Sequence, residues 1–207
     1  MRVAMIIALL PMAHALRVCT NTACRKAGSK DTLEGLHALA STASTARAAP
    51  AVDARVPAAA TVQFAFASAR VKSCGCLGGC GRGPNVVDEA SGEVYHDVYK
   101  PASAVSLLEE VEGLHVPEAA ARAWLKRMYA VRALRANDPA EALGLLSLAL
   151  NEAGTLRTRA AHMLSLLLEM RADIHDMLRH DNEAETDRQR AEQMRRLQVP
   201  EAAATAD

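Results

Sequence analysis

The spacing of apolar residues divides the chain into a first part of short mixed elements and a second part that is helical throughout. In the first part, residues 16–18 predict a short strand, and Leu33 and Leu36 recur at helical spacing after an N-cap expected at Asp31. Apolar and polar residues alternate over residues 62–66, which predicts another strand. The first part is therefore expected to combine strands with helices.

The remainder of this first part contains a hairpin, a helix and an insertion. Residues 85–88 and 93–96 are short apolar runs on either side of a Ser-Gly turn, which predicts a β-hairpin. Pro101 is expected to begin a helix that continues through Val111. Ala, Ser, Thr and Pro dominate the stretch before the hairpin, so residues 37–60 are predicted to be a flexible insertion in a domain that spans residues 16–115.

The second part, residues 116–198, shows helical spacing and a faint internal repeat. Asp138 followed by Pro139 and Glu141 is a strong helix start, with Asp138 as the N-cap. Small residues at an offset of 42 positions would let paired helices approach closely, and they are Ala130, Ala142 and Ala149, repeated as Ala172, Ala184 and Ala191. This pattern weakly resembles tetratricopeptide-like (TPR-like) hairpins, and a plain antiparallel helical bundle is the alternative. Residues 199–207 are expected to form a disordered tail.

Composition narrows the classes of function. Of the 207 residues, 24 are basic and 24 are acidic, with no basic run, so nucleic-acid binding has no electrostatic support. Aromatic residues are only 3% of the chain, and we expect Trp124 and Tyr129 to serve as packing residues. His175 and His180 are expected on a solvated helix face. No Ser/His/Asp set or phosphate-binding loop rises above chance, so the sequence gives no motif that supports a catalyst.

Four of the five cysteines form two spaced pairs. Cys19 and Cys24 make a C-x4-C, and Cys76 and Cys80 make a C-x3-C in a glycine-rich loop. Four thiolates from two loops satisfy a [2Fe–2S] cluster, with two sulfurs for each iron. Glycines let such a loop approach the cluster and turn its N–H groups toward the sulfurs. On spacing alone, a zinc site or a plain thiol pair remains an alternative.

These segments resemble a known family. Residues 18–29 resemble the opening of thioredoxin-like [2Fe–2S] ferredoxins, residues 76–87 resemble their second cluster loop, and residues 94–98 resemble their closing strand. The family also includes the thioredoxin-like subunit of respiratory complex I. The resemblance covers about residues 17–115 and implies a thioredoxin-like α/β fold that passes single electrons. It also implies the metal ligands, which are Cys19, Cys24, Cys76 and Cys80.

Three functions are weighed from the sequence. The first is a [2Fe–2S] electron-transfer protein whose helical domain docks a redox partner. The second is an adaptor with a structural zinc or thiol site and TPR-like protein binding, and the third is a cluster-bearing subunit of an NADH-dehydrogenase-like oxidoreductase. The fifth cysteine, Cys74, is an extra thiol that we do not expect to be a required ligand.

The first fifteen residues have the features of a targeting signal. Arg2, an apolar run over residues 3–10 and the small-residue site at 13–15 together predict a targeting leader over residues 1–15. Eight apolar residues are too few to span a bilayer. Because an iron–sulfur protein needs reduced thiols, we expect import into an organelle, a plastid ahead of a mitochondrion.

Overall fold

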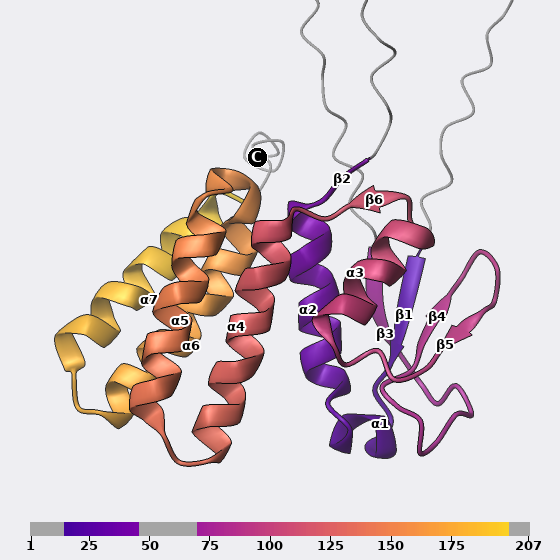
Figure 1. Cartoon of the computed structure of the whole chain (residues 1–207), viewed down its shortest axis with the longest axis horizontal. Helices are drawn as coiled ribbons and strands as arrows, with labels where there is room; N and C mark the ends of the chain where they lie inside the picture. Colours follow the sequence, from indigo (N-terminus) through magenta and orange to yellow (C-terminus); the bar gives the residue numbers. More distant parts are fainter. Residues whose placement is uncertain (1–14, 46–69, 199–207) are drawn as a thin grey trace, which may run out of the picture.

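The computed structural model describes residues 15–45 and 70–198, which fold into a small mixed sheet with helices beside it and a group of longer helices (Figure 1). The expected combination of an α/β part followed by a helical part is therefore confirmed. The predicted strand at 62–66, the tail at 199–207 and all of the predicted leader except Ala15 lie outside the described residues.

The sheet has four strands in the order β3-β1-β4-β5. Strand β1 (Ala15–Cys19) pairs in parallel with β3 (Arg70–Cys74), and it pairs antiparallel with β4 (Val86–Asp88), which in turn pairs antiparallel with β5 (Val94–Tyr95). The predicted first strand and the predicted hairpin are thus confirmed. The register sets Cys19 opposite Cys74, so β1 and β3 end at the same edge of the sheet.

Helices cover this sheet and a second small ladder closes the domain. They are α1 (Thr22–Lys26), α2 (Ser29–Thr42) and α3 (Pro101–Glu110), and β2 (Ser44–Thr45) pairs with β6 (Leu114–His115). The helix expected to start after Asp31 starts at Ser29 instead, because Gly28 adopts a left-handed conformation (φ 97°) and takes the N-cap position. Of the predicted insertion at 37–60, residues 37–42 continue α2 and residues 46–60 lie outside the described part.

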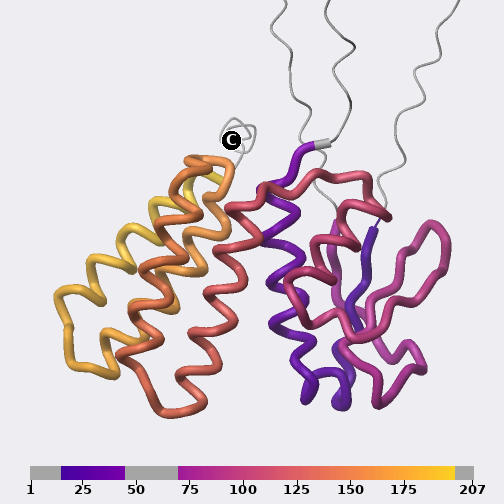
Figure 2. Tube along the Cα trace, in the orientation of Figure 1, coloured from indigo at the N-terminus to yellow at the C-terminus, as the bar shows by residue number. Residues whose placement is uncertain are grey.

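The second part consists of two helical hairpins, whose order can be followed along the trace in Figure 2. In the first hairpin, α4 (Glu118–Arg135) packs against α5 (Pro139–Gly154). A short 3-10 helix, η1 (Arg157–Ala160), leads to the second hairpin, in which α6 (Ala161–Met177) packs against α7 (Asp181–Arg196). The carboxylate of Asp138 accepts a hydrogen bond from the Glu141 N–H at 2.9 Å, which confirms the predicted N-cap. The six repeated alanines are all fully buried, so they are contact points between helices.

Helix α2 joins the two parts by packing on the sheet and on α3 while also contacting α4 and α6 (Figure 1). Trp124 of α4 lies over Gly35, where an added Cβ would be 2.7 Å from the indole ring. Beside it, Arg127 is buried, donates to Glu34 at 2.7 Å and places its guanidinium 4.4 Å from the centre of the Trp124 ring. Buried apolar residues therefore form one continuous core through both parts.

Candidate cysteine site

Four segments bring the cysteines to one edge of the sheet. Cys19 ends β1, Cys24 lies in α1, and Cys74 ends β3. Cys76 and Cys80 follow in the loop before β4. Because β1 and β3 are parallel, the loops that follow them meet at the same edge. The fold therefore gathers residues that lie more than fifty positions apart in the chain.

The second pair has the spacing of two ligands on one metal atom. The Sγ atoms of Cys76 and Cys80 are 3.7 Å apart. Four sulfurs arranged tetrahedrally about 2.3 Å from a metal are separated from one another by about 3.8 Å. The backbone N–H of Gly78 also points to the Cys76 sulfur, at 3.4 Å. The loop thus holds two sulfurs close together and turns a backbone donor toward one of them.

The first pair is buried, and its two thiols differ in acidity. Burial raises the pKa of Cys19, but N–H groups of Asn21 and Leu77 and the thiol of Cys24 outweigh burial, so the net pKa is lowered. Burial and the hydrogen bond to Cys19 raise the pKa of Cys24. Cys19 is therefore the thiolate-forming member. Its contact with Leu77 also connects the first loop to the second.

The two pairs act on each other electrostatically. The hydrogen bond with Cys76 and the negative charge of Cys76 raise the pKa of Cys80, and Cys19 adds to this rise. Cys80 in turn raises the pKa of Cys24. Neighbouring thiols that oppose one another's ionisation favour a bound cation, which would relieve that repulsion.

Asn85 is a site residue that the sequence analysis did not single out. It is 1% exposed, and its amide nitrogen lies 3.8 Å from the Cys24 sulfur and 3.0 Å from the Gly79 carbonyl oxygen. Its Oδ1 is 2.9 Å from Nδ1 of His96, and its backbone oxygen accepts from the Cys19 N–H at 2.9 Å. A polar residue directly before the apolar β4 was the available signal. Asn85 ties both cysteine segments together.

Two glycines allow this close approach. A Cβ on Gly83 would lie 2.7 Å from the Cys24 sulfur. A Cβ on Gly79 would lie 2.7 Å from the Asn85 side-chain nitrogen. Since real Cβ atoms do not come so near, the loop can only fold against Cys24 and Asn85 when both positions lack a side chain.

Cys74 lies next to the site but is held mainly through its backbone. Its carbonyl oxygen accepts from the N–H of Thr20 at 3.0 Å and from the Thr20 hydroxyl at 3.1 Å. Burial raises the pKa of the Cys74 thiol, and the neighbouring Cys19 adds to that rise. The hydrogen bonds that the described residues make to Cys74 therefore engage its backbone and fix it at the end of β3.

Among residues 15–45 and 70–198, no three His, Cys, Asp or Glu side chains form a group that could hold a metal ion. The four thiols, the backbone donors at Asn21, Leu77 and Gly78, and the glycine contact at Cys24 nonetheless suit a thiolate-bound metal group. For all four thiols to act as ligands, the Cys19–Cys24 pair and the Cys76–Cys80 pair must bind the same metal group.

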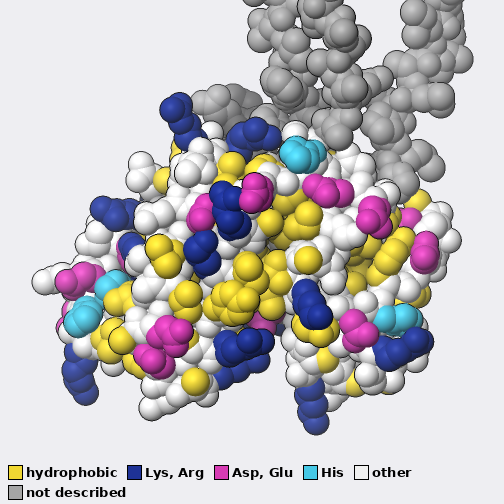
Figure 3. Space-filling view, in the orientation of Figure 1, with side chains coloured by type: hydrophobic (Ala, Val, Ile, Leu, Met, Phe, Trp, Pro, Cys, Tyr) yellow, Lys and Arg dark blue, Asp and Glu magenta, His cyan; other side chains and the backbone are white. Residues whose placement is uncertain are grey.

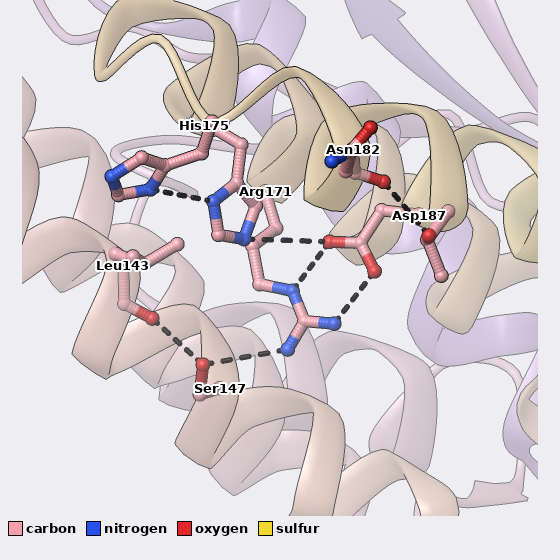
Figure 4. A network of polar contacts seen from close by, with 8 residues as sticks. Leu143, Ser147, Arg171, His175, Asn182 and Asp187 are labelled. Carbon is pink, nitrogen blue, oxygen red and sulfur yellow. Dashed lines mark hydrogen bonds and ion pairs between the residues drawn. The ribbon is translucent and has the colours of Figure 1, made fainter.

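The helical part contains a separate polar network, drawn in Figure 4. Arg171 donates two hydrogen bonds to the buried carboxylate of Asp187, at 2.6 and 2.7 Å, and contacts the Ser147 hydroxyl at 3.4 Å. His175 is not fully solvated as expected: its Nδ1 lies 3.3 Å from Nδ1 of His180, and its Nε2 lies 4.0 Å from Asp187. These contacts connect α5, α6 and α7 and so stabilise the helical packing.

The chain matches no protein-family model, no curated protein and no solved structure at a significant level. Along the part of the chain that the structure describes, no helix is both long enough and apolar enough to cross a membrane. The site must therefore be interpreted from its own residues.

Proposed function

We propose that the protein is a [2Fe–2S] electron-transfer protein whose cluster is held by Cys19, Cys24, Cys76 and Cys80. The single observation that carries this proposal is the gathering of two cysteine pairs at one sheet edge, with the Cys76 and Cys80 sulfurs 3.7 Å apart. Such a cluster, when bound, accepts and gives up one electron at a time.

The residues around the thiols have separate roles in this proposal. The N–H groups of Leu77 and Gly78 would stabilise negative charge on the sulfurs, and Asn85 would hold Cys24 in place through a second layer of contacts. Gly79 and Gly83 keep the loop against these groups. Burial of Cys19 and Cys24 shields one side of the site from water.

The mixed sheet supports the thioredoxin-like fold implied by the family resemblance. A parallel β1-α2-β3 unit is followed by the antiparallel β4-β5 hairpin and by α3, and the cysteines cluster where β1 and β3 end. The two hairpins with buried alanines likewise support a TPR-like arrangement of α4 to α7. We propose that this helical part docks the redox partner, and that the chain works in a plastid.

A structural zinc in an adaptor protein is the second candidate, because the 3.7 Å sulfur spacing fits either metal. Anaerobic purification followed by iron, zinc and acid-labile sulfide analysis and a visible spectrum distinguishes the two. We expect two irons and two sulfides per chain with charge-transfer absorption in the visible region. One zinc per chain with no labile sulfide would overturn the proposal in favour of the adaptor.

Single substitutions test the ligand set within the same experiment. We expect Cys24→Ser, Cys76→Ser or Cys80→Ser to lose or distort the cluster, and Cys74→Ser to keep it. Cys74→Ser is the matched control because it changes a thiol beside the site. The hydrogen bonds that fix Cys74 in place are made by its backbone carbonyl, which the substitution leaves unchanged. Bleaching by Cys74→Ser as severe as that by Cys76→Ser would show that the ligand assignment is wrong.

A further inference from the structure

An open groove of about 720 Å³ runs between α3 and α4. Its floor and walls carry the large apolar side chains of Val105, Leu125 and Met128, and Tyr99 and Tyr129 stand at its margin, 46% and 45% exposed. Tyr129 is therefore not the packing residue that the sequence suggested. Figure 3 shows the corresponding apolar patch over α4, bordered by basic side chains. An exposed apolar groove of this kind marks an interaction surface.

The charges around the groove are unevenly distributed. A short connection links the end of α3 to the start of α4, so Glu109 and Glu110 lie at one end and Lys100 at the other (Figure 1). Lys100 and Arg132 lie over the rings of Tyr99 and Tyr129, 5.5 and 5.9 Å from their centres. Neither cation has a carboxylate partner among residues 15–45 and 70–198.

The other cation at the groove is already neutralised. Arg122 pairs with Glu118 at 2.6 Å and with Glu152 at 3.1 Å. At the acidic end, Glu109 accepts from the Val116 N–H at 3.3 Å, and Glu110 accepts from Ser106 at 2.7 Å. The Lys100 and Arg132 end therefore carries positive charge that has no carboxylate partner among the described residues. The Glu109 and Glu110 end carries negative charge that these hydrogen bonds hold in place but do not neutralise.

The size and lining of the groove favour a helix as its occupant. From Ala121 to Arg132, α4 lines the groove over about 17 Å, which is the length of three helical turns. A groove between two helices with aromatic margins takes the apolar face of an amphipathic helix through anchors at i, i+4 and i+7. Small-molecule sites instead bring several polar groups together, and here Ser106, Glu109 and Glu110 are engaged with their own neighbours.

We propose that this groove binds an amphipathic helix of a partner protein that carries acidic residues at the end facing Lys100 and Arg132. The inference deepens the proposed function, and it rests on that function only for the nature of the partner as a redox protein. The location supports this link, because Tyr99 closely follows His96, which is hydrogen-bonded to Asn85 beside Cys24. A helix anchored at Tyr99 would hold its protein next to the cysteine site.

The test uses a fluorescein-labelled, stapled three-turn peptide with Leu at i, i+4 and i+7 and Glu residues at one end, titrated into the full chain by fluorescence anisotropy. We expect saturable binding that weakens about tenfold when Lys100→Glu and Arg132→Glu are combined. Tyr129→Ala is expected to weaken binding at least about tenfold as well. A peptide with Lys in place of Glu should regain affinity for the charge-reversed protein.

Matched controls lie outside the groove. Leu148→Ala removes an apolar side chain on α5 that is 51% exposed, and Lys72→Glu reverses an exposed charge on β3. Both should bind the peptide as the unaltered chain does. The inference is overturned if these controls weaken binding as much as the groove variants, or if the groove variants bind normally.

Other occupants give different results, each of which also overturns the inference. Concentration-dependent dimerisation that Tyr129→Ala abolishes would show that a second copy fills the groove. Failure of the peptide to bind, with Tyr129→Ala altering the nuclear magnetic resonance signals of residues 1–14, would assign the groove to the chain's own first residues. Iron and sulfide content measured on the same samples separates this inference from the proposed function. If the protein contains no cluster but still binds the peptide, the proposed function is contradicted and the groove inference stands.

Discussion

In the cysteine region, segments of backbone approach one another at glycines, whereas in the helical region whole helices approach one another at alanines. Gly79 and Gly83 leave room for Asn85 and the Cys24 sulfur, while Ala142 and Ala184 are fully buried between helices. A missing side chain permits irregular loops that turn N–H groups toward a site, and a methyl group permits regular helices to pack closely. The cysteines accordingly lie in and beside irregular loops, whereas the longer helices form regular packed interfaces.

The strongest test of this comparison is the junction of the two regions. Trp124→Ala removes the indole that packs on Gly35 and beneath Arg127, and we expect it to lower the free energy of unfolding by about 3–5 kcal/mol. Urea denaturation followed by circular dichroism measures the loss. Tyr129→Ala, on the same helix but half-exposed, is the control and should cost less than about 1 kcal/mol. Equal losses would mean that the junction is not a packed core.

Adding one methyl group in the cysteine region gives the next largest effect. Gly83→Ala places a carbon 2.7 Å from the Cys24 sulfur, so it should destabilise the chain by about 1–3 kcal/mol. Under the proposed function it should also reduce the iron content. Gly75→Ala is the matched change, because a Cβ at Gly75 meets nothing within 4 Å. Thermal unfolding and iron analysis of both variants check the expectation, and identical behaviour would contradict the role of close approach at Gly83.

Removing the contacts of Asn85 tests how the loop is held. Asn85→Leu preserves bulk at a buried position but leaves the half-buried Gly79 carbonyl without its donor, so we expect a loss of about 1–2 kcal/mol in the free energy of unfolding. The resonance of His96 should also move, because its Nδ1 loses the Asn85 oxygen. Asn151→Leu on the exposed face of α5 serves as the control. A variant with unchanged stability and an unmoved His96 signal would show that the hydrogen bonds of Asn85 do not contribute to the free energy of unfolding.

The smallest effect concerns surface charge in the helical region. Hydrogen bonds from Lys126 and Arg122 hold the pKa of Glu152 below its ordinary value of 4.5. Because the unfolded chain binds this proton more tightly, the stabilisation is complete above about pH 5 and is lost as the pH falls through 4.5 and the lowered folded value.

Glu152→Gln should therefore reduce the acid sensitivity of unfolding over this pH range by a small, salt-dependent amount. Urea titrations at several pH values measure the slope of stability against pH. Glu183→Gln is the control, since the Glu183 carboxylate has no cationic partner in the described part of the chain. An unchanged slope for Glu152→Gln would show that these ion pairs contribute nothing.

Local pattern was enough to locate most regular elements. Pro101 marked the start of α3, and Asp138 marked the start of α5. The short apolar runs on either side of the Ser-Gly turn predicted the β4-β5 hairpin. The offset of 42 positions identified alanines that prove to be buried contacts. These features depend on neighbours within a few residues or on helical period, and such information is present in the sequence itself.

Tertiary structure decided what distant segments do together. Pairing of β1 with β3 brings Cys19 and Cys24 toward Cys76 and Cys80, and only the folded loop shows Asn85 bridging them. The left-handed Gly28 moved the start of α2, and the position of α4 beside α3 left Tyr129 exposed while burying Trp124. Spacing identifies residue types that can act, but distance, burial and exposed faces arise from contacts between residues far apart in the chain, which no local pattern encodes.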